Sequence, residues 1–192
     1  MPYPSGTVFL DTKYGVQAML RAVCLVFFLA SSANAGDVAY RFEWQGAGGY
    51  TMRGAMSFDV ALLGRKLVRE DDLSCFQITG YLGEEQIGRW ALGNLTLDTT
   101  WTLTFSPSAE AFEVYSEVHP MPQAWNMDGY GENCGTPGFG FNIGNAAQDI
   151  CVDGQLVVES QMPPPTPFPV QRVQSVKFAS DACRPEVLLS RL

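Results

Sequence analysis

Val38-Ala-Tyr40-Arg-Phe42-Glu-Trp44 is the stretch that decides the fold. Its large apolar side chains alternate with small or charged ones, which is typical of a β-strand with one buried face and one face in water. Gln45-Gly-Ala-Gly-Gly49 supplies a flexible turn, and the alternation returns in Tyr50-Thr-Met52-Arg-Gly54-Ala-Met56-Ser-Phe58. The two runs therefore predict an antiparallel hairpin, with Arg41 and Glu43 facing water.

Short runs of the same kind continue along the chain. Asp153-Gly154 lies between two apolar runs and predicts a two-residue hairpin turn, because both residues tolerate positive φ. Val60 to Arg69 is the one predicted helix, with Asp59 as N-cap, and Pro163 to Pro169 is expected to run as polyproline II outside the sheets. The remaining strand candidates cover residues 73–79, 86–92, 101–105, 112–118, 139–143, 150–152, 156–158 and 173–178. About ten short strands predict an all-β fold with at most one short helix, either an antiparallel β-sandwich or a β-barrel.

Composition excludes several classes of protein. The chain has 192 residues, with 12 Lys and Arg against 20 Asp and Glu, and a formal net charge of −8. This acidity argues against nucleic acid as a partner, since nucleic-acid binding relies on basic residues that neutralise phosphates. With 46% hydrophobic and 17% charged residues, the chain can build a core and is not a disordered tail.

The first 35 residues predict export. Met19-Leu-Arg21 is a basic start, residues 22–30 are apolar and uncharged, and Ala33-Asn-Ala35 has the small-x-small pattern that signal peptidase cleaves. The apolar run covers only ~14 Å at about 1.5 Å per residue, well short of a ~30 Å bilayer core. We predict translation from Met19, or a long leader from Met1, and a single secreted or periplasmic domain over residues 36–192 with no membrane span after cleavage.

Four cysteines remain after removal of the leader, which carries Cys24. An even number of cysteines in an oxidising compartment favours disulfides, and their wide spacing does not suit a zinc site. We predict Cys134 paired with Cys151, which closes a short loop, and by elimination Cys75 with Cys183. Sequence alone leaves other pairings open.

The hairpin region carries a resemblance. Tyr40-x-Phe42-x-Trp44-x-Gly46, then Gly49-Tyr50-x-x-x-Gly54-x-x-Ser57-Phe58-Asp59, Asp71-Asp72-Leu73 and the later Asp153-Gly154 resemble the β-rich ectodomains of bacterial secreted proteins of the PEP-CTERM (exosortase-sorted) type. The resemblance covers roughly residues 38–158 and implies export and a β-rich fold. The family's C-terminal sorting tail has no counterpart in Pro185–Arg191, which argues against sorting to a wall or membrane.

The segment from Pro120 to Gly138 is the predicted functional loop. It gathers the aromatic and acidic side chains of Trp125, Asp128, Tyr130 and Glu132 on a glycine-rich backbone, and we interpret these as binding residues. The alternative is a surface loop that packs Trp125 over a sheet edge. Oxygen ligands in the same loop, including Asn126 and Asn133, suit Ca²⁺ but lack the spacing of a recognised calcium loop. We therefore predict no metal and no cofactor, with calcium as the weaker alternative.

Catalytic patterns are sparse. His119 is the single histidine, and no G-x-S-x-G element accompanies it. Glu113 and Glu117 share one face of a predicted strand with Tyr115, which is also the pattern of a solvated sheet face, and Glu84 and Glu85 are further carboxylates. We predict a secreted, non-catalytic β-domain of the binding or surface-associated kind, with a glycan or a surface protein as partner. The alternative is a small extracytoplasmic carbohydrate-active hydrolase that uses a carboxylate pair.

Overall fold

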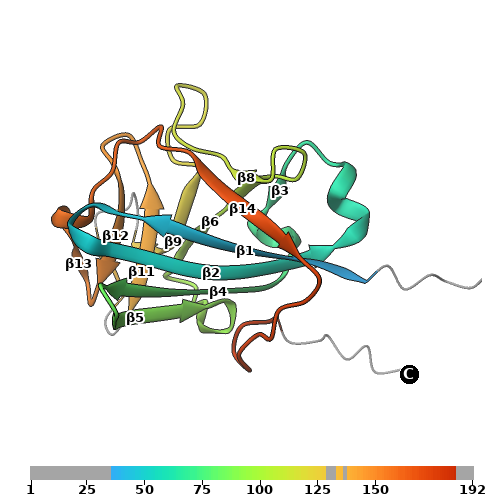
Figure 1. The fold of residues 1–192 in the computed structure, drawn as a ribbon, viewed down its shortest axis with the longest axis horizontal. Helices are drawn as coiled ribbons and strands as arrows, with labels where there is room; N and C mark the ends of the chain where they lie inside the picture. The colour runs from blue at the N-terminus through green and yellow to red at the C-terminus, as the bar shows by residue number, and fades with distance from the viewer. Residues whose placement is uncertain (1–35, 129–132, 136–137, 185–192) are drawn as a thin grey trace, which may run out of the picture. The chain divides into compact units, whose positions relative to one another are not determined.

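Two antiparallel sheets make up the fold in a computed structural model that describes residues 36–128, 133–135 and 138–184 (Figure 1). The all-β prediction is confirmed, and the arrangement, in which one sheet curls into a half-barrel, fits a sandwich or a barrel. The predicted leader over residues 1–35 lies outside the described residues.

The larger sheet contains the hairpin that the sequence predicts. Its eight strands follow the order β3-β7-β8-β14-β1-β2-β4-β5. Val38 lies opposite Phe58 and Trp44 opposite Met52, so the alternation of β1 and β2 stays in register along the whole hairpin. The strands are β1 (Asp37–Gln45), β2 (Tyr50–Asp59), β3 (Val68–Arg69), β4 (Leu73–Leu82), β5 (Glu85–Ala91), β7 (Thr104–Ser106), β8 (Ala111–Phe112) and β14 (Phe168–Val173).

The smaller sheet follows the order β10-β9-β11-β12-β13, and β6 also pairs with β9. The predicted turn between β12 and β13 is confirmed, with φ of 47° at Asp153 and 81° at Gly154. The strands are β6 (Thr100–Thr102), β9 (Gln123–Asp128), β10 (Asn133–Cys134), β11 (Phe139–Ile143), β12 (Gln148–Val152) and β13 (Gln155–Leu156).

Helical structure in the described residues is limited to short 3₁₀ turns. The predicted helix over 60–69 is only a turn at Val60–Gly64, and Asp59 caps it as predicted, its Oδ1 accepting from the Ala61 N–H at 2.8 Å. The turns are η1 (Ala47–Gly49), η2 (Val60–Gly64), η3 (Glu70–Asp72), η4 (Leu92–Asn94) and η5 (Val158–Ser160).

The predicted strand over 101–105 is in fact two strands in two sheets. β6 pairs with β9 in the smaller sheet, whereas β7 pairs with β3 and β8 in the larger one. Leu103, between them, is fully buried. The chain crosses from one sheet to the other at this residue, and period-two alternation does not reveal the crossing because both segments keep a side chain in the core.

The predictions for two other strands are also wrong. The strand expected over 112–118 ends with β8 at Phe112, and a turn follows in which the Ser116 N–H donates to the His119 carbonyl at 3.2 Å. The strand expected over 173–178 is absent, because β14 covers Phe168–Val173 and ends where that prediction begins. The expectation that Pro163 to Pro169 runs outside the sheets is therefore wrong at its end, since Phe168 and Pro169 belong to β14. Pro169 pairs with Ala111 of β8 and lies beyond the part of β14 that pairs with β1, so its missing N–H costs no bond to β1.

The core lies between the two sheets and is rich in aromatic rings. Trp125 of β9 is at its centre, with ring centroids 4.9–6.0 Å from Phe42, Phe76, Phe112, Phe141 and Phe168. Gly80 and Gly88 of the larger sheet leave room for the Phe139 ring, since a Cβ at Gly88 would lie 2.8 Å from the Phe139 Cβ. Burial of so many rings fixes which face of each strand points inward.

Candidate functional site

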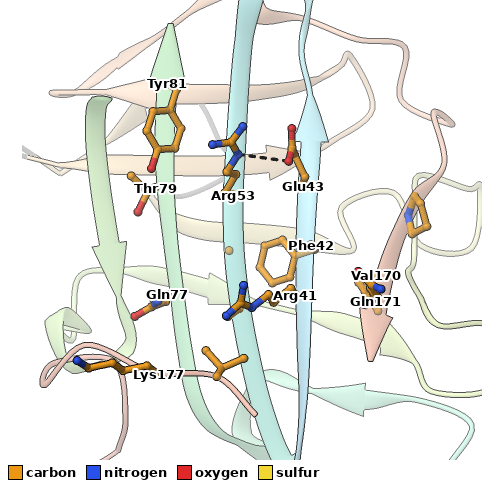
Figure 2. A pocket seen from close by; sticks show the side chains of 14 residues that line it. Arg41, Phe42, Glu43, Arg53, Gln77, Thr79, Tyr81, Val170, Gln171 and Lys177 are labelled. Carbon is orange, nitrogen blue, oxygen red and sulfur yellow. Dashed lines mark hydrogen bonds and ion pairs between the residues drawn. The ribbon is translucent and has the colours of Figure 1, made fainter. Parts of the chain in front are cut away.

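The outer face of the larger sheet carries a groove over β1, β2, β4 and β14 (Figure 2). Because Tyr40, Phe42 and Trp44 turn into the core, Arg41 and Glu43 point to the outer side. The alternation in the sequence thus determines which side chains reach this face, although the sequence alone marks the two residues only as water-facing positions.

The floor of the groove is low because Ala55, which faces outward between Arg41 and Gln77, has a small side chain. Ala55 lies opposite Arg41, and Gly54 lies opposite Phe42. On the core side of the sheet, Gly54 leaves room for the Phe42 ring, which packs against the backbone of β2. The groove has a volume of about 620 Å³, and its polar lining consists of Arg41, Glu43, Arg53, Gln77, Thr79, Tyr81, Gln171 and Lys177.

Charge in the groove is mainly positive although the chain as a whole is acidic. Arg53 is held in place, with its Nε 3.3 Å from the Glu43 carboxylate and its guanidinium 5.4 Å from the centroid of the Tyr81 ring. Figure 2 shows Arg53 between these two side chains. Arg41 and Lys177 form no salt bridge with any described residue. The groove therefore offers two cations whose charge is not compensated locally.

One wall of the groove comes from the segment 174–184, which follows β14 and which we call the strap. Val176 and Lys177 line the groove, and the Ala179 N–H donates to Gln77 Oε1 at 3.0 Å. Further along, the Cys75–Cys183 disulfide ties the strap to β4 and confirms the predicted pairing. The wall is therefore fastened to the sheet that it borders.

An ion pair also fastens the strap. Both guanidinium nitrogens Nη1 and Nη2 of Arg89 donate to Asp181, at 2.7 and 2.8 Å. The Arg89 hydrogen bonds lower the pKa of the Asp181 carboxyl, and they raise that of Arg89. Since both side chains are about a third exposed, the pair orients the strap more than it stabilises the fold.

The predicted binding loop is for the most part not an exposed loop. Gln123–Asp128 forms β9, and Trp125 is 0% exposed, with its indole N–H donating to Gln123 Oε1 at 3.2 Å. The prediction that Trp125 is an exposed loop residue is therefore wrong, because five aromatic rings from both sheets surround it. Asp128 is exposed at the end of β9, whereas Tyr130 and Glu132 lie outside the described residues.

The calcium alternative gains no support from the described part of the loop. Asn126 is buried, and its side-chain amide donates to the Phe139 carbonyl at 2.9 Å. Asp128 shares a pocket of about 170 Å³ with Asp98 and Thr99. Within 36–128, 133–135 and 138–184, no three His, Cys, Asp or Glu side chains gather in a group that would hold a metal ion.

Other predicted carboxylate positions are dispersed. Because β8 ends at Phe112, Glu113 and Glu117 do not share a strand face, and Tyr115 packs against the core. Glu84 and Glu85 lie at the β4–β5 turn. His119 uses its backbone N–H to bond Ser116, through the Oγ at 3.0 Å.

Among the described residues, Asp149 has a buried carboxylate, which sequence reasoning did not single out. It is 4% exposed and accepts hydrogen bonds from Asn142 and from Gln161. Burial raises its pKa, against the opposing effect of the two hydrogen bonds. Its position on β12, opposite Asn142 of β11, places it on the outer face of the smaller sheet.

Comparisons with protein-family models, with curated proteins and with solved structures find no match. The resemblance to PEP-CTERM ectodomains therefore stays a prediction from the hairpin motifs. Among the described residues, no helix has the length and apolar character needed to cross a membrane.

Proposed function

We propose that this chain is a secreted, non-catalytic β-domain that binds a ligand in the groove on the outer face of its larger sheet. The observation that carries the proposal is the pair of uncompensated cations, Arg41 and Lys177, in a groove of about 620 Å³. Ligand sites in proteins have volumes of about 300–1,000 Å³ and a few well-placed polar groups.

A rigid frame supports binding at this place. The floor belongs to β1, β2 and β4, which are interior strands paired on both sides. The polar side chains are therefore held on regular strands, and binding orders little additional chain. The strap wall is likewise tied, by the Cys75–Cys183 disulfide.

A hydrolase is the less favoured function. Glycoside hydrolysis needs two carboxyl groups that flank the scissile bond, and Glu43 is the one carboxylate in the lining of the groove, where it pairs with Arg53. Asp98 and Asp128 do line one pocket, but its volume of about 170 Å³ is small for a sugar ring with its neighbours.

Export is the second part of the proposal. It rests on the leader-like sequence before Gly36 and on two disulfides, Cys75–Cys183 and Cys134–Cys151. Disulfides form and persist in oxidising compartments such as the periplasm and the cell exterior.

The experiment is a glycan array run with the purified chain beside a panel of chromogenic glycosides. We expect binding without hydrolysis. Thr79→Trp, which fills the groove, should abolish binding, whereas the control Thr51→Trp, on the same face but outside the lining, should preserve it. Hydrolysis of a glycoside, or equal binding by both variants, would contradict the proposal.

A further inference from the structure

We infer that the ligand of the groove is an acidic glycan of the polyuronate class, a sugar chain that carries carboxylates on its rings. This inference rests on the proposed binding role and specifies its ligand. It follows from three features of the groove: its uncompensated cations, its single acid and its uncharged polar side chains.

The uncompensated cations favour an anionic ligand. Figure 2 shows Arg41 extending from β1 over β2, with Lys177 on the strap beyond Gln77. Arg41 is exposed and lacks a salt bridge with the described residues. A guanidinium presents a planar fork that matches a carboxylate in a bidentate geometry. A ligand carboxylate would supply the partner that the protein itself does not.

The single acid limits the charge density of that ligand. Glu43 lies in the same lining as Arg41, and Arg53 is already engaged with Glu43 and with the Tyr81 ring. A polymer of higher charge density, such as double-stranded nucleic acid with one charge per about 1.7 Å of its axis or a heavily sulfated glycan, would bring further anions against Glu43. The net charge of −8 adds long-range repulsion. A carboxylate on each ring, spaced by the length of a sugar, suits two cations better.

The uncharged side chains suit hydroxyl groups. Gln77, Gln171 and Thr79 also line the groove, and amide and hydroxyl side chains both donate to and accept from sugar hydroxyls. Tyr81 adds a half-buried ring with a phenolic hydroxyl. These groups would contact the part of each sugar that carries no charge.

An acidic peptide fits less well. Peptides commonly bind a sheet by adding a strand to a free edge, but β1, β2 and β4 have neighbours on both sides, and β14 pairs with β8 and β1. The backbone groups under the groove are therefore engaged. Recognition must come from side chains alone, which favours a hydroxyl-rich polymer over a peptide.

The test compares each uronate with its own methyl ester, which has the same sugar backbone, and adds two other polyanions. Isothermal titration of the purified chain would use polygalacturonate and polymannuronate oligosaccharides, their fully methyl-esterified neutral forms, dextran sulfate and poly-glutamate. We expect at least one uronate to bind about tenfold or more tightly than its ester, which corresponds to the loss of one charge-assisted hydrogen bond. Added salt should weaken the binding of the charged form and leave the ester unaffected.

A matched pair of variants locates the charge. Arg41→Gln should weaken uronate binding by about tenfold and ester binding by less, while the circular dichroism spectrum stays unchanged. The control Lys66→Gln removes one exposed cation outside the groove and should leave uronate affinity unaltered. An equal loss in both variants would show a nonspecific charge effect and overturn the inference.

The remaining outcomes separate the inference from the proposed function. Equal affinity for a uronate and its ester, lost in Thr79→Trp, would overturn the uronate class and leave the binding role standing. Tighter binding of dextran sulfate, or binding of poly-glutamate that depends on Arg41, would also overturn the class. If no probe on the glycan array or in this series binds, both proposals fall.

Discussion

The outer faces of the two sheets differ in almost every respect. On the larger sheet, a polar groove with Arg41 and Lys177 in its lining runs over β1, β2, β4 and β14, and the strap forms one of its walls. The corresponding face of the smaller sheet is buried, with Ala124, Met127 and the Cys134–Cys151 disulfide packed in a second apolar cluster. Cys134–Cys151 joins two strands of the smaller sheet, whereas Cys75–Cys183 fixes the strap beside the groove of the larger sheet.

A β-bulge helps to produce this difference. Asn126 has a φ of 54°, and the pairing of β6 with β9 passes from Met127 to Trp125 without it. One extra residue turns the next side chain to the opposite face. Trp125 therefore points into the main core while Met127 joins the outer cluster. Burial on both faces leaves these strands little surface for a ligand, so we place binding on the larger sheet.

The largest expected difference between the two sheets comes from removing each disulfide in turn. The paired cysteines are 108 residues apart for Cys75–Cys183 and 17 apart for Cys134–Cys151. Loop entropy predicts losses of about 4.7 and about 3 kcal/mol in the free energy of unfolding. Urea denaturation of the two double Cys→Ser variants would measure both. We also expect weaker groove binding only in the variant without Cys75–Cys183, because its strap wall is released, and equal binding in the two would contradict this comparison.

The next test compares a substitution in the core with one in the groove by their effects on the free energy of unfolding. Trp125→Ala should lower the free energy of unfolding by about 3–5 kcal/mol, since it leaves a cavity among five rings. Arg41→Gln should change it by less than about 0.5 kcal/mol, because the side chain is exposed. Urea unfolding checks both, and Trp125→Phe, which keeps a ring, should recover part of the loss if Trp125→Ala does not fold. A Trp125→Ala protein of unaltered stability would refute its central position.

Substitution of a glycine at the interface of the sheets should have the next largest effect on stability. Gly80→Ala should cost about 1–3 kcal/mol, because a Cβ would run into the buried Phe139 ring. Gly64 has no atom within 4 Å of such a Cβ, so Gly64→Ala is the matched control and should be neutral or slightly stabilising. Thermal unfolding of both variants is the measurement, and equal melting temperatures would show that the sheets can separate at this point.

Acid titration should give the smallest effect, with opposite signs for two carboxyls. Burial raises the pKa of Asp149, so its stabilising contribution is present below the ordinary aspartate pKa of about 3.9 and is lost as the pH rises through the folded value. Asp181 has a lowered pKa through Arg89, so its contribution is present above about pH 3.9 and is lost as the pH falls through its folded value.

The variants isolate these two contributions. Relative to the unmodified chain, Asp149→Asn should gain stability as the pH rises above about 3.9, whereas Asp181→Asn should lose it. Free energies of unfolding measured between about pH 3 and 7 would give both slopes. Parallel curves for the two variants would show that the buried and the exposed carboxyl do not differ as the structure indicates.

Sequence alone was sufficient for the features that depend on near neighbours. The alternation in β1 and β2, the Asp153-Gly154 turn and the Asp59 cap all follow from residues a few positions apart. The short loop favours Cys134–Cys151, whereas Cys75–Cys183, 108 residues apart, was reached only by elimination. The water-facing position of Arg41 follows from the same alternation. The all-β class rests on these local patterns, because strand, turn and cap preferences act over short stretches of chain.

Only the tertiary structure decided which exposed-looking residues are buried and where a groove forms. Trp125 has aromatic and polar neighbours in the sequence, yet rings from distant strands enclose it. The crossing at Leu103 depends on the pairing of β6 with β9 and of β7 with β3 and β8. The position of the strap depends on contacts such as Arg89 with Asp181, 92 residues apart. A local pattern predicts which side chains lie on the same face of a strand. It does not predict which segments cover that face, because those segments come from far along the chain. The groove lies where the strap leaves the large sheet uncovered.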